Sequence, residues 1–153
     1  MYTKVLVPLD GSELAEGALP EVIKLAKAGA IGEVVLLKVI EIEVINLPKA
    51  YERSIDFGAL RNAHQSESIK YLEGVQARLQ KEGIRVNTAL LEGRPEDKFV
   101  DYAKSSAVDL IVIGTHGYTG MRRLMFGSVA LRVLHDANVP VLLIRVKGAQ
   151  EKH

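Results

Sequence analysis

The stretch from Leu110 to Val133, which reads LIVIGTHGYTGMRRLMFGSVALRV, constrains the fold more than any other part of the chain. It begins with an apolar run that stops at Gly114, and it ends in a helical pattern that follows Gly127 and Ser128. This order predicts a buried strand, a loop punctuated by glycines, and a helix whose first turn begins at Ser128. The stretch is therefore predicted to be one strand–loop–helix unit of an α/β fold.

The same stretch has the features of a phosphate-binding loop. Glycine carries no Cβ, so the backbone N–H groups near Gly114, Gly117 and Gly127 can come close to a ligand. The N-terminus of the following helix offers unpaired N–H donors and a partial positive charge. Arg122 and Arg123 lie inside the loop, and their long, positively charged side chains could extend to a phosphate. The glycines could instead only shape a tight connection, but three glycines with a serine and two arginines favour phosphate binding.

The spacing of these residues resembles a known signature. Gly114, Gly117, Gly127 and Ser128 match the pattern G-2X-G-9X-G-[S/T] without a gap. On this match the chain is similar to the nucleotide-binding branch of the universal stress protein family. The resemblance covers nearly the whole chain, from VLVPLDGS at residues 5–12 to VPVLLI at residues 139–144. It implies that the protein holds ATP, with Mg²⁺ or Mn²⁺ bound by the phosphates.

Strand-like and helix-like patterns alternate along the chain. Apolar runs predict strands, and apolar residues at helical spacing predict helices. Such alternation predicts a doubly wound, five-stranded parallel sheet of Rossmann-like type, with helices on both faces. The resemblance implies the strand order 3-2-1-4-5, which brings the turns after the first and fourth strands side by side. The predicted strands span residues 4–9, 33–40, 84–90, 109–113 and 140–146. Helices are predicted after Ser12, which is the expected N-cap, from Leu60 to Gly83, from Pro95 and from Ser128.

Three local features refine this prediction. Pro20 lies inside the first helical pattern, where a proline predicts a kink or a bulge. Residues 84–90 alternate between apolar and polar, which indicates a strand at the edge of the sheet. The long helix that ends at Gly83 has a polar face that is predicted to be ordinary solvated surface: Arg61, Gln65, Glu67, Lys70, Glu73, Arg78 and Lys81.

Composition limits the domain organisation and the classes of function. At 153 residues and 48% hydrophobic content, the chain is expected to form one domain, residues 1–147, with a polar tail at 148–153 and a long functional or mobile loop at 41–55. A net charge of +1 gives no electrostatic reason to expect nucleic acid or a membrane surface as a partner. The lack of Cys excludes disulfides and thiolate metal sites. No apolar run reaches ~20 residues and no signal-peptide pattern is present, so a cytoplasmic location is expected.

Asp10 is the candidate residue at the end of the first strand. Its carboxylate could accept hydrogen bonds from a ribose or orient a metal-bound phosphate, or it could cap the following helix. From the residues alone both roles stay open, and the resemblance favours the ligand. The resemblance also places Pro8 and Leu9 along the base pocket, and Val39 against the adenine edge through its main chain. In its own context Val39 is an ordinary core valine.

His116 and Ser128 each have two interpretations. A serine at a helix N-terminus can cap the helix and also contact a phosphate. His116 either touches phosphate or ribose or is structural, because neither a nucleophile nor an orienting carboxylate is predictable beside it. The prediction therefore includes no catalytic residue and no protein metal site. The complete set of candidate nucleotide-binding residues is Pro8, Leu9, Asp10, Ser12, Val39, Ile113, Gly114, His116, Gly117, Arg122, Arg123, Gly127, Ser128 and Val129.

The last predicted strand carries a quaternary inference. Val141 to Ile144 are aliphatic without interruption, and an exposed edge strand of this kind promotes aggregation unless something covers it. Pairing of Val141–Val146 with the same strand of a second copy would cover it, and the resemblance implies such a homodimer. Helices of the same chain could bury the strand instead.

The favoured function is that of an ATP-binding regulatory protein of the stress response. The alternative is a slow ATPase or nucleotidyl-transfer enzyme that uses the same cleft. Hydrolysis needs a positioned nucleophile and neutralisation of the charge on the leaving oxygens, and only Asp10 and His116 are weak candidates for a base. A signalling receiver domain is excluded because the third strand ends in Leu91-Glu92-Gly93, without the required aspartate. Neither G-x-x-x-x-G-K-[ST] nor a G-x-G-x-x-G after the first strand is present.

Overall fold

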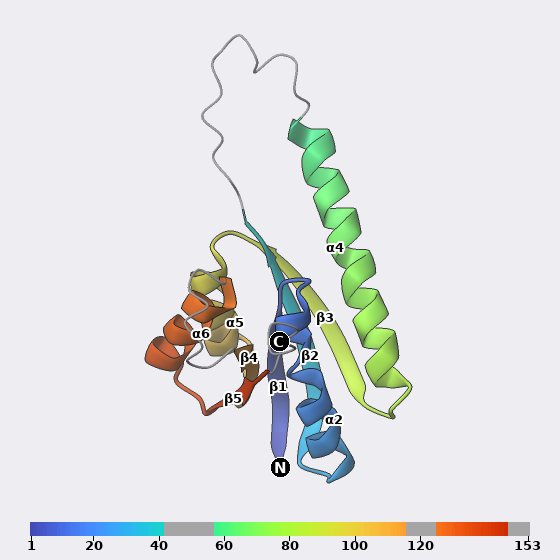
Figure 1. Cartoon of the computed structure of the whole chain (residues 1–153), viewed down its shortest axis with the longest axis vertical. Coiled ribbons are helices and arrows are strands. Elements are labelled where there is room, and N and C mark those ends of the chain that lie inside the picture. Colours follow the sequence, from blue (N-terminus) through green and yellow to red (C-terminus); the bar gives the residue numbers. More distant parts are fainter. Residues whose placement is uncertain (42–56, 116–124, 147–153) are drawn as a thin grey trace, which may run out of the picture.

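The computed structural model describes residues 1–41, 57–115 and 125–146, with the backbone alone for Phe57, Met125 and Phe126. It contains a five-stranded parallel sheet in the order β3-β2-β1-β4-β5, with helices on both faces (Figure 1). The predicted doubly wound α/β fold and its strand order are confirmed. The strands are β1 (Tyr2–Leu9), β2 (Ile31–Ile40), β3 (Arg85–Glu92), β4 (Leu110–Thr115) and β5 (Val141–Arg145), and the helices are α1 (Glu13–Glu16), α2 (Leu19–Lys27), α4 (Phe57–Gln80), α5 (Pro95–Ser105) and α6 (Met125–Asp136).

Several predictions lie outside the described residues. They are the loop at 41–55 from residue 42 onward, the tail at 148–153, and the site residues His116, Gly117, Arg122 and Arg123. The boundary of the expected domain at residue 147 also lies there, so the domain limits stay a prediction.

β1 forms the centre of the sheet and of the core. Val5, Leu6, Val7 and Leu9 have no exposed surface, because β2 and β4 flank the strand and helices cover its faces. α1, α2 and α4 lie on one face of the sheet, and α5 and α6 lie on the other (Figure 1). A strand that is covered on both faces needs apolar residues at successive positions, which explains the apolar run without alternation.

The first helical segment is divided in two. Ser12 caps α1 as predicted, since its hydroxyl accepts a hydrogen bond from the N–H of Ala15 at 3.1 Å. α1 ends at Glu16 and α2 begins at Leu19, so Pro20 occupies the first turn of α2. A proline there removes no helical hydrogen bond, because the N–H groups of a first turn have no intrahelical acceptor. The irregularity predicted at Pro20 is thus a complete break between two helices.

β3 lies at one edge of the sheet and pairs with β2 alone. Arg85 and Asn87 are exposed and Val86 between them is buried, so the predicted edge strand with one wet face is confirmed. α4 covers β2 and β3 with an apolar face that includes the buried residues Leu72 and Val75. The N-terminal turns of α4 extend beyond the carboxyl edge of the sheet (Figure 1).

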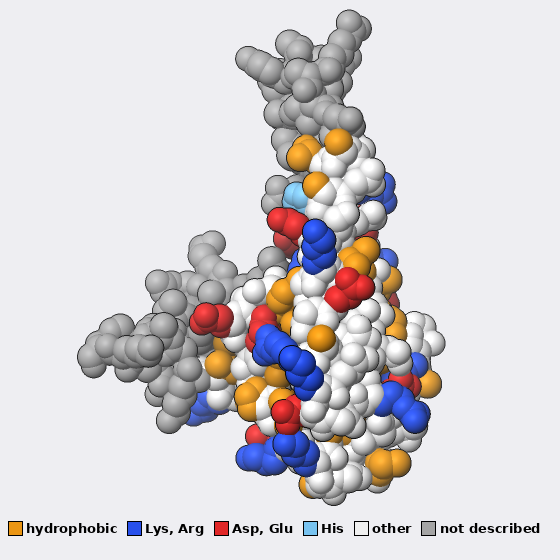
Figure 2. All heavy atoms as spheres, turned by 90° about the vertical axis from the view of Figure 1, so that its right-hand side faces the viewer, with side chains coloured by type: hydrophobic (Ala, Val, Ile, Leu, Met, Phe, Trp, Pro, Cys, Tyr) orange, Lys and Arg blue, Asp and Glu red, His pale blue; other side chains and the backbone are white. Residues whose placement is uncertain are grey.

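The opposite face of α4 is charged. Glu67, Lys70, Glu73 and Lys81 are exposed, and acidic and basic side chains are interspersed along this side of the molecule (Figure 2). The prediction of a solvated surface holds for these four residues. Within the described residues, no helix has the length and apolar character that a membrane span requires.

β5 forms the other edge of the sheet and pairs with β4 from Val141 to Arg145. Leu142 and Leu143 are 36% and 37% exposed, and as successive strand residues they point to opposite faces of the sheet. Both faces of β5 therefore retain accessible apolar surface, so the described helices do not bury this strand completely.

α6 begins earlier than predicted. The helix starts at Met125, so Gly127 is its third residue and Ser128 its fourth. The prediction that its first turn begins at Ser128 is therefore wrong. The N–H groups up to the third helical residue have no intrahelical acceptor, so the N–H donors that lack a partner within this helix end at Gly127.

Candidate functional site

β1 and β4 part at the carboxyl edge of the sheet. Their parallel register ends at Leu6 and Ile111, although β1 continues to Leu9 and β4 continues to Thr115. In doubly wound sheets, ligands bind in the crevice where the strand order reverses. The fold therefore provides a candidate site between the ends of β1 and β4.

The opposite ends of the same two strands are held together. The carboxylate of Asp109, just before β4, accepts hydrogen bonds from the N–H groups of Thr3 at 2.8 Å and Lys4 at 2.9 Å. The N–H of Asp109 in turn donates to the carbonyl of Lys4 at 3.0 Å. The ammonium group of Lys4 also donates to the carbonyl of Ser106 at 2.9 Å. β1 and β4 are thus joined at their amino ends and diverge toward their carboxyl ends.

Asp10 and Ser12 form a compact turn after β1. Asp10 Oδ1 accepts two hydrogen bonds from Ser12, one from the backbone N at 2.9 Å and one from Oγ at 2.5 Å. Ser12, and not Asp10, caps α1, so the capping role left open for Asp10 belongs to Ser12, and Asp10 orients that cap through these two hydrogen bonds. Within the described part of the chain no donor reaches Oδ2 of Asp10. One oxygen of this half-buried carboxylate therefore serves the turn, while the other can still accept a hydrogen bond from a ligand.

The motif glycines have different surroundings. A Cβ on Gly114 would lie 2.5 Å from the carbonyl oxygen of Leu14 and 3.2 Å from Cγ2 of Val146. This glycine is buried and allows α1 to pack directly on β4, so it does shape a tight connection. A Cβ on Gly127 would meet nothing within 4 Å among the described residues. Among the described residues, a side chain at Gly127 would therefore have space at the start of α6, where Ser128 is also exposed.

Most of the other described candidates are core residues. Leu9, Ile113 and Val129 have no exposed surface, Val39 is 7% exposed, and Pro8 is buried. Their side chains pack between the sheet and the helices. A ligand at the strand ends would therefore meet the main chain of these residues rather than their side chains.

The polar candidates gather on two sides of the carboxyl edge. Asp10 and Ser12 follow β1, and Gly127 and Ser128 lie at the beginning of α6, the helix that follows β4. Across residues 1–41, 57–115 and 125–146, no group of three His, Asp or Glu side chains is arranged to hold a metal ion.

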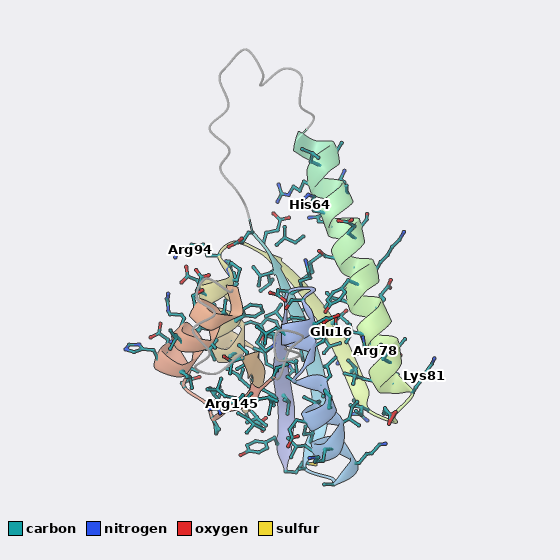
Figure 3. The ribbon with its side chains drawn as sticks, viewed as in Figure 1. Glu16, His64, Arg78, Lys81, Arg94 and Arg145 are labelled. Atoms are coloured by element: carbon teal, nitrogen blue, oxygen red, sulfur yellow. The ribbon has the colours of Figure 1, made fainter. Side chains whose placement is uncertain are left out.

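The sequence did not reveal that α4 is tied to α1. The hydroxyl of Tyr71 donates to Glu16 Oε2 at 2.7 Å, and the guanidinium of Arg78 donates to Glu16 Oε1 at 2.9 Å. Figure 3 shows Glu16 and Arg78 side by side between the two helices. No local pattern could have paired Tyr71 with Glu16, since 55 positions separate them in the chain.

Two further links join α4 to the ends of β2 and β3. The ammonium group of Lys38 donates to Oγ of the buried Ser68 at 2.8 Å. Arg61 donates to both carboxylate oxygens of Glu92, at 3.0 and 2.5 Å, and Gln65 donates to one of them at 2.7 Å. Arg61 and Arg78 are exposed, as predicted for a solvated face, while Gln65 is half-buried. The sequence did not reveal that all three also form these links with other elements. The side of α4 that faces the sheet changes from apolar to polar where it passes the strand ends.

These links change the pKa values of Tyr71 and Glu92, among other groups. Burial, and then the hydrogen bond to Glu16, raise the pKa of Tyr71, and the negative charge of Asp10 adds to this rise. The phenol therefore stays protonated at neutral pH and acts as a hydrogen-bond donor. The pKa of Glu92 is lowered chiefly by the hydrogen bonds from Arg61.

The family can now be assigned, because the model of the universal stress protein family matches residues 1–145, nearly the whole described fold. The chain belongs to this family. It is 32% identical over 162 residues to the universal stress protein MJ0577 of Methanocaldococcus jannaschii, and the match covers 97% of this chain and 98% of the relative.

Solved structures of universal stress proteins share the fold. The structure of MJ0577 matches 97% of this chain and 99% of its own with a TM-score of 0.76. A universal stress protein in complex with cAMP is 19% identical, with 94% of this chain and 96% of that one covered and a TM-score of 0.68. An Arabidopsis thaliana member with AMP bound is 21% identical, with 99% and 95% covered and a TM-score of 0.68.

Proposed function

We propose that this universal stress protein binds ATP between the ends of β1 and β4, with the phosphates against the N-terminus of α6. The observation that carries the proposal is the parting of the two strands beyond Leu6 and Ile111. The start of α6, the helix that follows β4, supports it, because a Cβ on Gly127 would meet no described atom within 4 Å. Such a helix end attracts anions through its free N–H groups and its dipole. The AMP and cAMP held by two solved family members support an adenine nucleotide as the ligand.

The residues present fit the parts of this ligand. Asp10 has a carboxylate oxygen that can accept hydrogen bonds from ribose hydroxyls. The main chain of Leu9 and Val39, at the ends of two neighbouring strands, is suited to the edge of the base. The N–H of Gly127 and the hydroxyl of Ser128 are suited to phosphate oxygens, and His116, Gly117, Arg122 and Arg123 are proposed to complete the phosphate site. Mg²⁺ or Mn²⁺ would bind through the phosphates.

We propose a regulatory role rather than turnover. The described residues supply acceptors, N–H donors and open space, which are the requirements of binding. Asp10 is committed through Oδ1 to Ser12, which holds its carboxylate in the turn. The occupied site would then set the conformation or assembly of a cytoplasmic stress-response protein. Slow hydrolysis in the same cleft is the alternative.

The test of binding uses the purified wild-type chain. Denaturation should release a nucleotide that chromatography identifies, and calorimetric titration of nucleotide-free protein should show ATP binding that GTP does not match. Steady release of ADP in the presence of Mg²⁺ or Mn²⁺ would favour the enzymatic alternative. Failure to bind any adenine nucleotide in either assay would overturn the proposal.

We also propose a homodimer formed through β5. The strand is an edge of the sheet, and Leu142 and Leu143 leave apolar surface accessible on both of its faces. Pairing with the same strand of a second copy would give hydrogen-bond partners to the backbone N–H and C=O groups of this edge and would cover the apolar surface.

A further inference from the structure

α1 cannot hold its position by itself. The helix has only four residues, Glu13–Glu16, and isolated helical turns of this length are unstable in water. Its first turn is capped by Ser12, which is also bonded to Asp10. The position of Asp10 and Ser12 therefore depends on contacts that other elements make with α1.

Glu16 makes the polar contact of α1 with the next long helix. Tyr71 donates to one carboxylate oxygen and Arg78 donates to the other, so α4 engages both oxygens of Glu16 (Figure 3). The side chain of Glu16 is 22% exposed, and the ring of Tyr71 is half-buried. Hydrogen bonds to a charged group in such surroundings are stronger than those between neutral groups. The contact therefore fixes one end of α1 against α4.

A short path connects this contact with the candidate site. Glu16 is adjacent to Ala15, and the N–H of Ala15 donates to Ser12 Oγ at 3.1 Å. Ser12 Oγ in turn donates to the carboxylate of Asp10. A shift of α1 against α4 would therefore move the hydroxyl that orients Asp10.

We propose that Tyr71 is a positioning residue for the nucleotide site, which holds Asp10 in place through its hydrogen bond to Glu16. The inference rests on the proposed ATP binding and deepens it. Tyr71 acts through α1 and does not itself contact the ligand. Loss of its hydroxyl should weaken the binding of ATP by loosening Asp10 and Ser12, while the ring remains packed between the helices.

The chain offers a matched control that separates an effect on Asp10 from a general loss of stability between these helices. Lys27, the last residue of α2, forms an ion pair with Glu82 at 2.7 Å just beyond α4. This link also ties the first helical segment to the end of α4, but it lies toward the amino edge of the sheet, where β2 begins at Ile31. Its removal tests whether any lost link between these helices affects the site.

The experiment measures the affinity for ATP by calorimetry in five proteins: the wild type, Tyr71→Phe, Glu16→Ala, Glu16→Gln and Lys27→Met. Tyr71→Phe should weaken the affinity about three- to tenfold, the range that follows from the loss of one hydrogen bond. Glu16→Ala should weaken it at least as much. Glu16→Gln keeps an acceptor oxygen for Tyr71 and should restore most of the affinity, and Lys27→Met should match the wild type. Far-UV circular dichroism establishes that each variant is folded.

The same substitution made in the Asp10→Ala variant tests whether Tyr71 acts through Asp10. In Asp10→Ala, the additional change Tyr71→Phe should alter the affinity less than twofold, because the group to be positioned is gone. The inference is overturned if folded Tyr71→Phe binds ATP within twofold of the wild type, if Lys27→Met loses as much, or if the effect of Tyr71→Phe is unchanged without Asp10. A wild type that binds no ATP would instead overturn the proposed function itself.

Discussion

The carbonyl oxygen of Leu14 lies 2.5 Å from the position that a Cβ on Gly114 would occupy. The backbone of α1 therefore lies directly against β4 at Gly114, and no space for even a methyl group remains between the two elements. The side chain of Val146, just beyond β5, closes the same space at 3.2 Å. Gly114 thus determines how closely the turn that carries Asp10 and Ser12 approaches the fourth strand.

Substitutions of the two motif glycines should have opposite effects on stability. Gly114→Ala should lower the free energy of unfolding by about 1–3 kcal/mol, because the added methyl overpacks a rigid backbone contact. Gly127→Ala should raise it by up to about 1 kcal/mol, because the methyl enters open space within a helix. Urea denaturation of both variants measures the difference. Equal effects would show that α1 does not rest on Gly114 as described.

Gly127→Val should abolish ATP binding while the fold survives. The branched side chain would fill the space beside the first turn of α6, where the phosphates are proposed to lie. Gly74→Val is the matched control, since Gly74 is also a helical glycine with open space around it but lies on the exposed side of α4. Calorimetry with ATP compares the two, and an affinity in Gly127→Val equal to that of the control would remove α6 from the site.

Tyr71 should ionise only above the ordinary tyrosine pKa of about 10, because burial and the hydrogen bond to Glu16 raise its pKa. A raised pKa in the folded state means that the stability due to the protonated phenol is fully present below the unfolded value of about 10 and is lost as the pH rises above it. Absorbance at 295 nm should therefore coincide for the wild type and Tyr71→Phe up to a pH of about 11. An additional phenolate in the folded wild type below that pH would contradict the burial of this hydroxyl.

Charge on β5 should convert the proposed dimer into a monomer. Leu142→Glu together with Leu143→Glu would place carboxylates on both faces of the edge strand, which prevents pairing with a second copy. Sedimentation or light scattering should give the wild type a mass near twice 16.8 kDa and the variant a single chain mass. Leu60→Glu, at a leucine that is 50% exposed on α4, should leave the mass unchanged. A monomeric wild type would refute the proposed dimer.

The layout of the sheet was predictable from local patterns and the family resemblance. The central strands carry apolar residues at successive positions because both faces are covered, as at Val5 to Leu9. The alternation around Val86 correctly indicated an edge strand. The cap at Ser12 was also correct, because a serine before acidic residues acts locally on its own helix.

Features that depend on distant contacts were not predictable. Serine is favoured at helix N-termini, which made Ser128 the predicted start of the helix. α6 nevertheless begins at Met125, since the position of the first turn also depends on how the helix packs against β4. Gly114 permits close packing because Leu14, which lies 100 positions earlier in the chain, approaches its backbone. Tyr71 meets Glu16 only because the fold places α4 beside α1. Each of these results from tertiary packing, which overrides local signals.

The attachment of Thr3 and Lys4 to Asp109 has a mechanical consequence. With the amino ends fastened and no register between β1 and β4 beyond Leu6 and Ile111, a change in their spacing at the carboxyl ends would break no ladder pair between these two strands. The spacing at that edge therefore depends on packing, in which α1 rests against Gly114 of β4, whereas the spacing at the opposite edge depends on the hydrogen bonds of Asp109.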